Sequence, residues 1–126
     1  MVDLDAMTEL HSQTTKLSSH ELVRRLNSHL GTTLVATLAG VRDRKLPYKW
    51  AVAGGPVPRD EPYRRLQAAH RVWTMISDAD NGYIARAWFI GANPRLEEQS
   101  PVMRLREGDI PAVMAAAKAF VEGLDD

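Results

Sequence analysis

Apolar residues recur at intervals of three and four along most of the chain from Leu22 onwards. This spacing places them on one face of an α-helix. The alternation of apolar and polar residues that is typical of strands never extends beyond a few positions. We therefore predict an all-α fold with six or seven helices.

Capping residues mark the first two predicted helices. Ser18 and Glu21 have the spacing of a capping box, in which each side chain accepts a hydrogen bond from the backbone amide of the other residue. Gly31 is expected to end this helix, because glycine is common just after a helix C-terminus. A second short helix is predicted over residues 32–39, ended by Gly40.

The later helices are predicted from further breaks in the pattern. Pro62 follows two acidic residues and favours a helix start there, and Ser100-Pro101 starts a short helix that Gly108 ends. A last helix is expected from Asp109 to about Glu122. The expected inward faces of the long helices are Tyr63, Leu66, Ala69, Trp73 and Ile76, then Ile84, Ala87, Trp88 and Gly91, and finally Ile110, Val113, Met114, Ala117, Phe120, Val121 and Leu124.

Composition and charge narrow the class of protein. The 126 residues are 44% hydrophobic and 25% charged and contain no cysteine, which is typical of one globular domain, or two small lobes, in a reducing compartment. Without a signal peptide or a membrane-length apolar run, we expect a cytoplasmic protein. The net charge is about −2 over residues 1–18, +6 over 19–76 and −4 over 77–126. This asymmetry suggests a nucleic-acid-facing part and a second part with another partner, although a chance distribution of surface charge explains it equally well.

The residue types that catalysis and metal binding require are not grouped in the sequence. The four histidines, at positions 11, 20, 29 and 70, form neither an HExxH nor a His-x-x-His pattern. Gly54-Gly55 lacks the lysine and hydroxyl residue of a phosphate-binding loop. We therefore expect a protein that is not an enzyme and that holds no metal or cofactor.

One constellation has the spacing of a helix-turn-helix motif. Ala36 is small enough for a helix crossing, Gly40 suits the turn, and Leu46 can pack the second helix back. Many helical hairpins share this spacing, and the basic stretch that follows has the alternative reading of a solvated face. Pro47 departs from the motif because it shortens or distorts the second helix. The residues expected to contact DNA are Arg42, Arg44, Lys45, Tyr48 and Lys49.

A family resemblance rests on these and later residues. The stretch from about Leu26 to Pro58 resembles the degenerate helix-turn-helix of Xre-like antitoxins, in which a tryptophan precedes a Gly…Pro break. The second half resembles the toxin-binding domain of the Xre/MbcA/ParS antitoxin family, whose related actinobacterial proteins are described as Xre-like DNA-binding regulators. The matching elements are Trp50, Gly54 and Pro58, then Trp88, Asn93-Pro94, Leu96, Ser100-Pro101, Leu105 and Gly108.

The resemblance implies an organisation and a function. It implies that residues 18–58 form a helix-turn-helix lobe that binds operator DNA, and that residues 59–126 form a lobe that binds a RES-domain, NAD-degrading toxin and forms a homodimer or hetero-oligomer. Residues 1–17 are predicted to be a mobile tail on separate grounds, because they are polar and lack helical periodicity. Stand-alone DNA binding by a homodimer without a toxin is the alternative. The last residues either plug the NAD pocket of the toxin or form a frayed end. The expected partner-binding residues are Phe120, Val121, Leu124, Asp125 and Asp126.

Overall fold

The computed structural model describes residues 17–124, and the expected mobile tail lies outside these residues except for Leu17. The described chain is all-helical and contains no strand, which confirms the predicted fold class. Its elements are α2 (Ser19–Leu30), α3 (Thr32–Ala39), α4 (Leu46–Trp50), α5 (Asp60–Ala79), α6 (Gly82–Ile90), the 3-10 helix η1 (Pro94–Leu96), α7 (Pro101–Arg106) and α8 (Ile110–Val121). Within residues 17–124, every helix is too short or too polar to cross a membrane.

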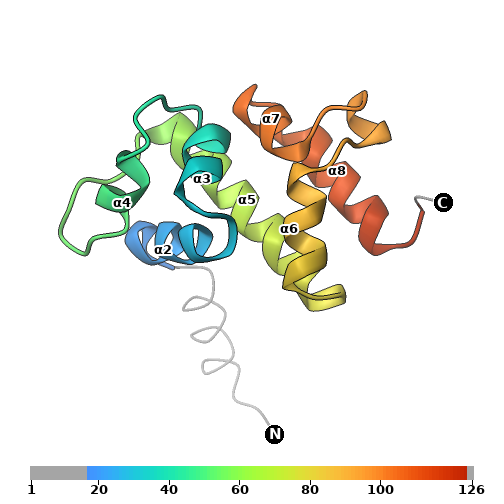
Figure 1. Cartoon of the computed structure of the whole chain (residues 1–126), viewed down its shortest axis with the longest axis horizontal. Helices are drawn as coiled ribbons and strands as arrows, with labels where there is room; N and C mark the ends of the chain where they lie inside the picture. The colour runs from blue at the N-terminus through green and yellow to red at the C-terminus, as the bar shows by residue number, and fades with distance from the viewer. Residues whose placement is uncertain (1–16, 125–126) are drawn as a thin grey trace, which may run out of the picture.

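Helix α5 is the central element of the molecule. It runs between α2, α3 and α4 at one end of the long axis and α6, α7 and α8 at the other (Figure 1). Helix α3 contacts α7 as well as α5, and α8 packs mainly on α5 and α7. The first and second halves of the sequence therefore share a broad contact.

Helix ends follow the capping residues closely. The Ser18 side chain accepts a hydrogen bond from the Glu21 amide at 3.1 Å, but the Glu21 carboxylate pairs with Arg24 and Arg25 and does not return the bond. Gly40 ends α3 in the left-handed conformation, with φ of 82°. The Val41 amide then bonds the Ala36 carbonyl at 3.1 Å, which is the Schellman arrangement of a glycine-terminated helix.

Two details of the later helices differ from the prediction. Helix α5 begins at Asp60, so Pro62 occupies its third position, which the first turn tolerates because that amide has no partner within the helix. In α6 the buried face consists of Ala85, Trp88 and Phe89, whereas Ile84 is 39% exposed. Both faces of α6 satisfy helical spacing, so packing against α5 and α7 selects between them.

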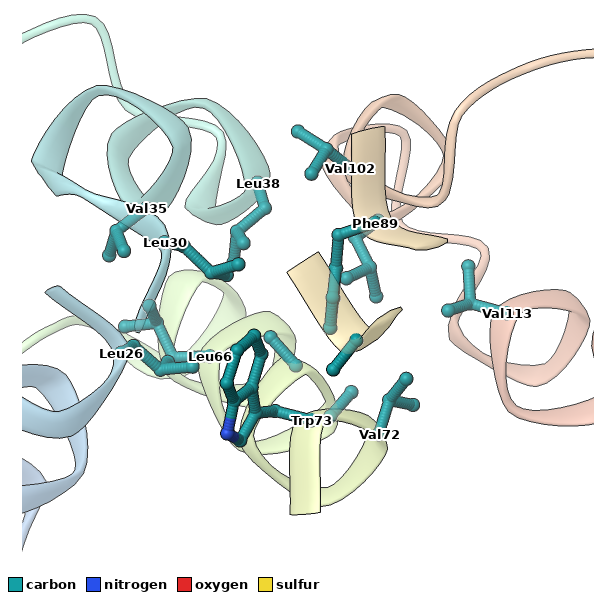
Figure 2. Close-up of a cluster of buried hydrophobic side chains, with 14 of the residues drawn as sticks. Leu26, Leu30, Val35, Leu38, Leu66, Val72, Trp73, Phe89, Val102 and Val113 are labelled. Atoms are coloured by element: carbon teal, nitrogen blue, oxygen red, sulfur yellow. The ribbon is translucent and has the colours of Figure 1, made fainter. Parts of the chain in front are cut away.

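One hydrophobic core joins all the long helices. Figure 2 shows that the cluster extends from Leu26 and Leu30 of α2 and Val35 and Leu38 of α3, past side chains of α5 and α6, to Val102 of α7 and Val113 of α8. Phe89 is fully buried among them. Because residues from both 18–58 and 59–126 contribute to this cluster, neither range has a separate core.

Two arginines add polar bonds across the same contact. Arg65 of α5 donates to the Ala39 carbonyl at 3.2 Å, and Arg106 of α7 donates to the Thr37 carbonyl at 2.9 Å. These carbonyls belong to the last turn of α3, where helical bonds run out, and the Thr37 carbonyl also accepts the Gly40 amide at 3.1 Å. Cationic donors also complement the negative end of the helix dipole. The end of α3 is therefore fixed from two neighbouring helices.

Candidate functional site

The first candidate site is the basic segment, residues 42–49, between the end of α3 and the end of α4. The sequence predicted all its basic residues on one helix, but Arg42, Arg44 and Lys45 precede α4, and only Tyr48 and Lys49 belong to it. The connection from α3 to α4, residues 40–45, is longer than the turn of three or four residues in a helix-turn-helix. The basic residues therefore do not all lie on the second helix, and the shortening of that helix expected from Pro47 is confirmed.

The cause lies in local turn chemistry. The Asp43 side chain accepts a hydrogen bond from the Lys45 amide at 2.9 Å, and its carbonyl accepts one from the Leu46 amide at 3.2 Å. These bonds hold a turn until Pro47, whose ring suits the first turn of a helix and not its interior. The five-residue helix α4 is the result.

The short helix α4 is nevertheless firmly anchored. Asn27 donates to the Pro47 carbonyl at 2.9 Å, and the ring of His20 lies 2.7 Å from the Trp50 carbonyl. Trp50 itself is buried, at 4% exposed, whereas Tyr48 is 63% exposed. The basic segment is thus an exposed, fixed group of cations that suits phosphate contacts better than deep reading of base edges.

The second candidate site is the C-terminal cleft, a hollow of about 510 Å³ at the end of α8. It brings together Trp88 and Phe120, which the sequence analysis singled out separately and which lie 32 positions apart in the chain. Of the predicted partner-binding residues, Phe120 and Leu124 line it, Val121 does not, and Asp125 and Asp126 lie outside the described residues. The lining residues are Trp88, Ala92, Asn93, Pro94, Arg95, Phe120 and Leu124.

Asn93 shapes the rim of the C-terminal cleft. Its buried side chain accepts a hydrogen bond from the Arg95 amide at 2.9 Å, and its amide and carbonyl bond Gln99 and Leu96 at 3.1 and 2.9 Å. Arg104 of α7 donates to the Leu96 carbonyl at 2.8 Å. These bonds fix the loop that carries Pro94, including two left-handed residues, Glu97 and Glu98, that would otherwise be costly.

The wall of the cleft is aromatic and holds an unused donor. The Trp88 ring meets Phe89 edge-on at 5.6 Å and lies 6.4 Å from Phe120, measured between ring centroids. Trp88 is 9% exposed, and its Nε1 is buried with no hydrogen-bond partner. Arg95 also reaches the end of α8, where it donates to the Leu124 carbonyl at 3.5 Å. The cleft therefore offers aromatic and apolar area and an exposed Leu124.

Sequence reasoning missed a third feature, the groove between α2 and α5. His29 stacks on Trp73 with ring centroids 4.3 Å apart, and His70 lines the same groove. Burial lowers the pKa of both histidines, and the charge of Arg25 lowers it further. Because His29 and Trp73 are 44 positions apart on different helices, no local pattern in the sequence pairs them.

The described residues hold no group of three or more His, Asp or Glu side chains that could bind a metal. Comparison with protein-family models, with curated proteins and with solved structures gives no match to this chain. The function proposed below therefore depends on the chain's own residues and their geometry.

Proposed function

We propose that this protein is a non-enzymatic, antitoxin-like transcriptional regulator of the cytoplasm. In this proposal the C-terminal cleft binds and neutralises a RES-domain toxin, and the basic segment contacts operator DNA. The main support is that two sets of residues line the same cleft. Trp88 and Asn93 are among the residues through which the sequence resembles the toxin-binding lobe of Xre/MbcA/ParS antitoxins. Phe120 and Leu124 are among the residues for which the sequence predicted partner contact.

The properties of the C-terminal cleft suit a protein partner. Its volume of about 510 Å³ can accept one or two large side chains, and aromatic walls of this kind act as anchors in protein interfaces. The rings of Trp88 and Phe120, with centroids 6.4 Å apart, provide this aromatic surface.

The partner proposal is tested with the full chain and a RES-domain toxin encoded beside it. We expect Phe120→Ser to weaken complex formation, because it removes one aromatic wall, while Lys118→Ala, an exposed change on the same helix, leaves it intact. Deleting residues 124–126 is expected to preserve the complex but release toxin activity. Full neutralisation by the shortened chain would contradict the tail-plug idea, and unchanged binding by Phe120→Ser would contradict the cleft.

The DNA proposal depends on the exposed cations of the basic segment. If four of them contact phosphates in each half of a dimer, the dimer makes eight phosphate contacts. A plot of the logarithm of the binding constant against the logarithm of salt concentration should then have a slope of about −7. Lys45→Ala with Lys49→Ala should weaken binding and flatten this slope, whereas Lys118→Ala should change neither. A wild-type chain that shows no salt-dependent binding to its own upstream DNA would contradict the proposal.

The alternative function is a stand-alone homodimeric regulator without a toxin. The exposed apolar residues of α6 favour it, since Tyr83 is 89% exposed and Ile90 is 46% exposed. Sedimentation of the purified protein distinguishes the two functions. The alternative would be favoured if the wild-type protein is a dimer, if Tyr83→Ser with Ile90→Ser makes it a monomer, and if no toxin gene lies beside the gene of this protein.

A further inference from the structure

The groove between α2 and α5 shares no described lining residue with the C-terminal cleft or the basic segment, although Tyr83 and Ile90 of the alternative dimer surface line the second hollow beside it. Its hollow measures about 770 Å³, and a second hollow of about 470 Å³ lies beside α6; His29 and Trp73 line both. Leu17, the first described residue, lines its beginning. An elongated hollow of this kind suits a stretch of peptide better than a compact ligand.

Arginines outnumber acidic side chains among the described residues that line the groove and the second hollow. Asp78 is the acidic side chain among the described lining residues. Apolar area is provided by Leu22, Met75 and the edge of Trp73. The lining residues that carry or can accept a positive charge are Arg25, His29, His70, Arg71 and Arg86. The complementary occupant is therefore a peptide that carries both acidic and apolar side chains.

The chain has such a segment directly before Leu17. Residues 1–10 read MVDLDAMTEL, with acidic residues at positions 3, 5 and 9, apolar residues between them and no basic residue. The distance from Leu17 to the His29 end of α2 is about 18 Å, which about six residues of extended chain can cover. A tether this short gives the segment an effective concentration of roughly millimolar at the groove.

We propose that the acidic segment, residues 1–10, docks in the groove between α2 and α5. Its carboxylates then face Arg25 and Arg71, and its apolar side chains cover Leu22 and Trp73. This inference does not depend on the partner or on DNA binding. It gives the groove an intramolecular ligand, so an external partner of this face must displace the segment.

Docking is linked to protonation of the two histidines. The charged groups that face them are Arg25 and Glu21 of α2, Arg71 and Asp78 of α5 and Arg86 of α6, and Arg25 already holds Glu21 at 3.1 Å. Added carboxylates stabilise the imidazolium forms, and by reciprocity protonation strengthens docking. The segment is therefore expected to bind more tightly below neutral pH.

The first test measures the pKa values of His29 and His70 by NMR titration of the full chain. Asp3→Asn, Asp5→Asn and Glu9→Gln together should lower both values by about 0.5 units or more. The matched control removes three acids outside the groove, Glu97→Gln, Glu98→Gln and Glu122→Gln, and should leave both values unchanged, because salt screens distant exposed charges. Equal histidine pKa values in the wild type and the segment variant would overturn the proposal.

A second test locates the segment directly. The chain has no cysteine, so Ala6→Cys accepts a single spin label. We expect selective broadening of the amide signals of His70 and Thr74 but not of Ala115 on α8, and loss of this broadening in 1 M salt or when the three segment acids are neutralised. Broadening confined to residues next to Leu17, and insensitive to those acids, would overturn the proposal.

Discussion

Replacing Trp88 by alanine and by phenylalanine separates the packing of this side chain from its unused hydrogen-bond donor. Trp88 is 9% exposed and lies 5.6 and 6.4 Å from the rings of Phe89 and Phe120. Loss of the whole indole removes these contacts and leaves a cavity, which typically costs about 3–5 kcal/mol. At roughly 4 °C per kcal/mol for a domain of this size, Trp88→Ala should lower the melting temperature by about 12–20 °C.

Trp88→Phe is expected to behave differently. It keeps an aromatic ring and sacrifices part of the volume, at a cost of about 1–2 kcal/mol. It also removes the buried Nε1, whose unsatisfied burial costs about 1–3 kcal/mol. The two contributions nearly cancel, so the free energy of unfolding should change by about 1 kcal/mol or less.

The measurement is urea unfolding followed by circular dichroism at pH 7, with the slope against urea compared among the three proteins. An unchanged slope shows that the substitutions alter stability and not the compactness of either state. If Trp88→Phe destabilises the chain by 3 kcal/mol or more, the indole N–H has a partner in the free protein. That result would refute the expectation that the Trp88 Nε1 is buried without a partner.

Two further predictions concern backbone conformation and pH. Gly40→Ala should lower the free energy of unfolding in urea by about 2 kcal/mol, because φ is 82° and the added Cβ would lie 2.8 Å from Nη1 of Arg65. Gly123→Ala is the control: φ is 73° but the space is open, so the cost should be about 1 kcal/mol. Equal costs would contradict the role of the arginine. His29 and His70 have pKa values below 6.5 in the folded protein, so the unfolded chain binds more protons and stability should fall as pH drops below about 6.5. His29→Gln with His70→Gln should flatten this fall between pH 7.5 and 5, and an unchanged slope would show that other groups cause it.

Local chemistry made most helix boundaries predictable. Ser18, Gly31 and Gly40 act through bonds to residues three to five positions away, so the sequence contains both partners of each bond. The face of α6 was not predictable, because Ile84 and Ala85 each begin a stripe with helical spacing and only the neighbouring helices select the second. Spacing alone defines a helix without orienting it.

The candidate site shows the same limit. The sequence singled out Trp88, Asn93 and Phe120 separately, and the structure places them around one cleft. The shortening of α4 was predictable, because Pro47 suits only the first turn of a helix. The position of Arg42, Arg44 and Lys45 before this helix was not. The stacking of His29 on Trp73 depends on two helices brought together by tertiary packing, which no spacing rule describes.

The bond from Arg106 to the Thr37 carbonyl has a consequence for how the chain can be divided. It joins residues 69 positions apart and, with Arg65, ties the helix that precedes the basic segment to the second half of the molecule. A cut near residue 58 would strip α3 of its terminal donors and open the shared core to water. If DNA binding and protein binding are separate tasks, as proposed, one folding unit carries both. A substitution that destabilises either end is then expected to weaken both proposed activities together.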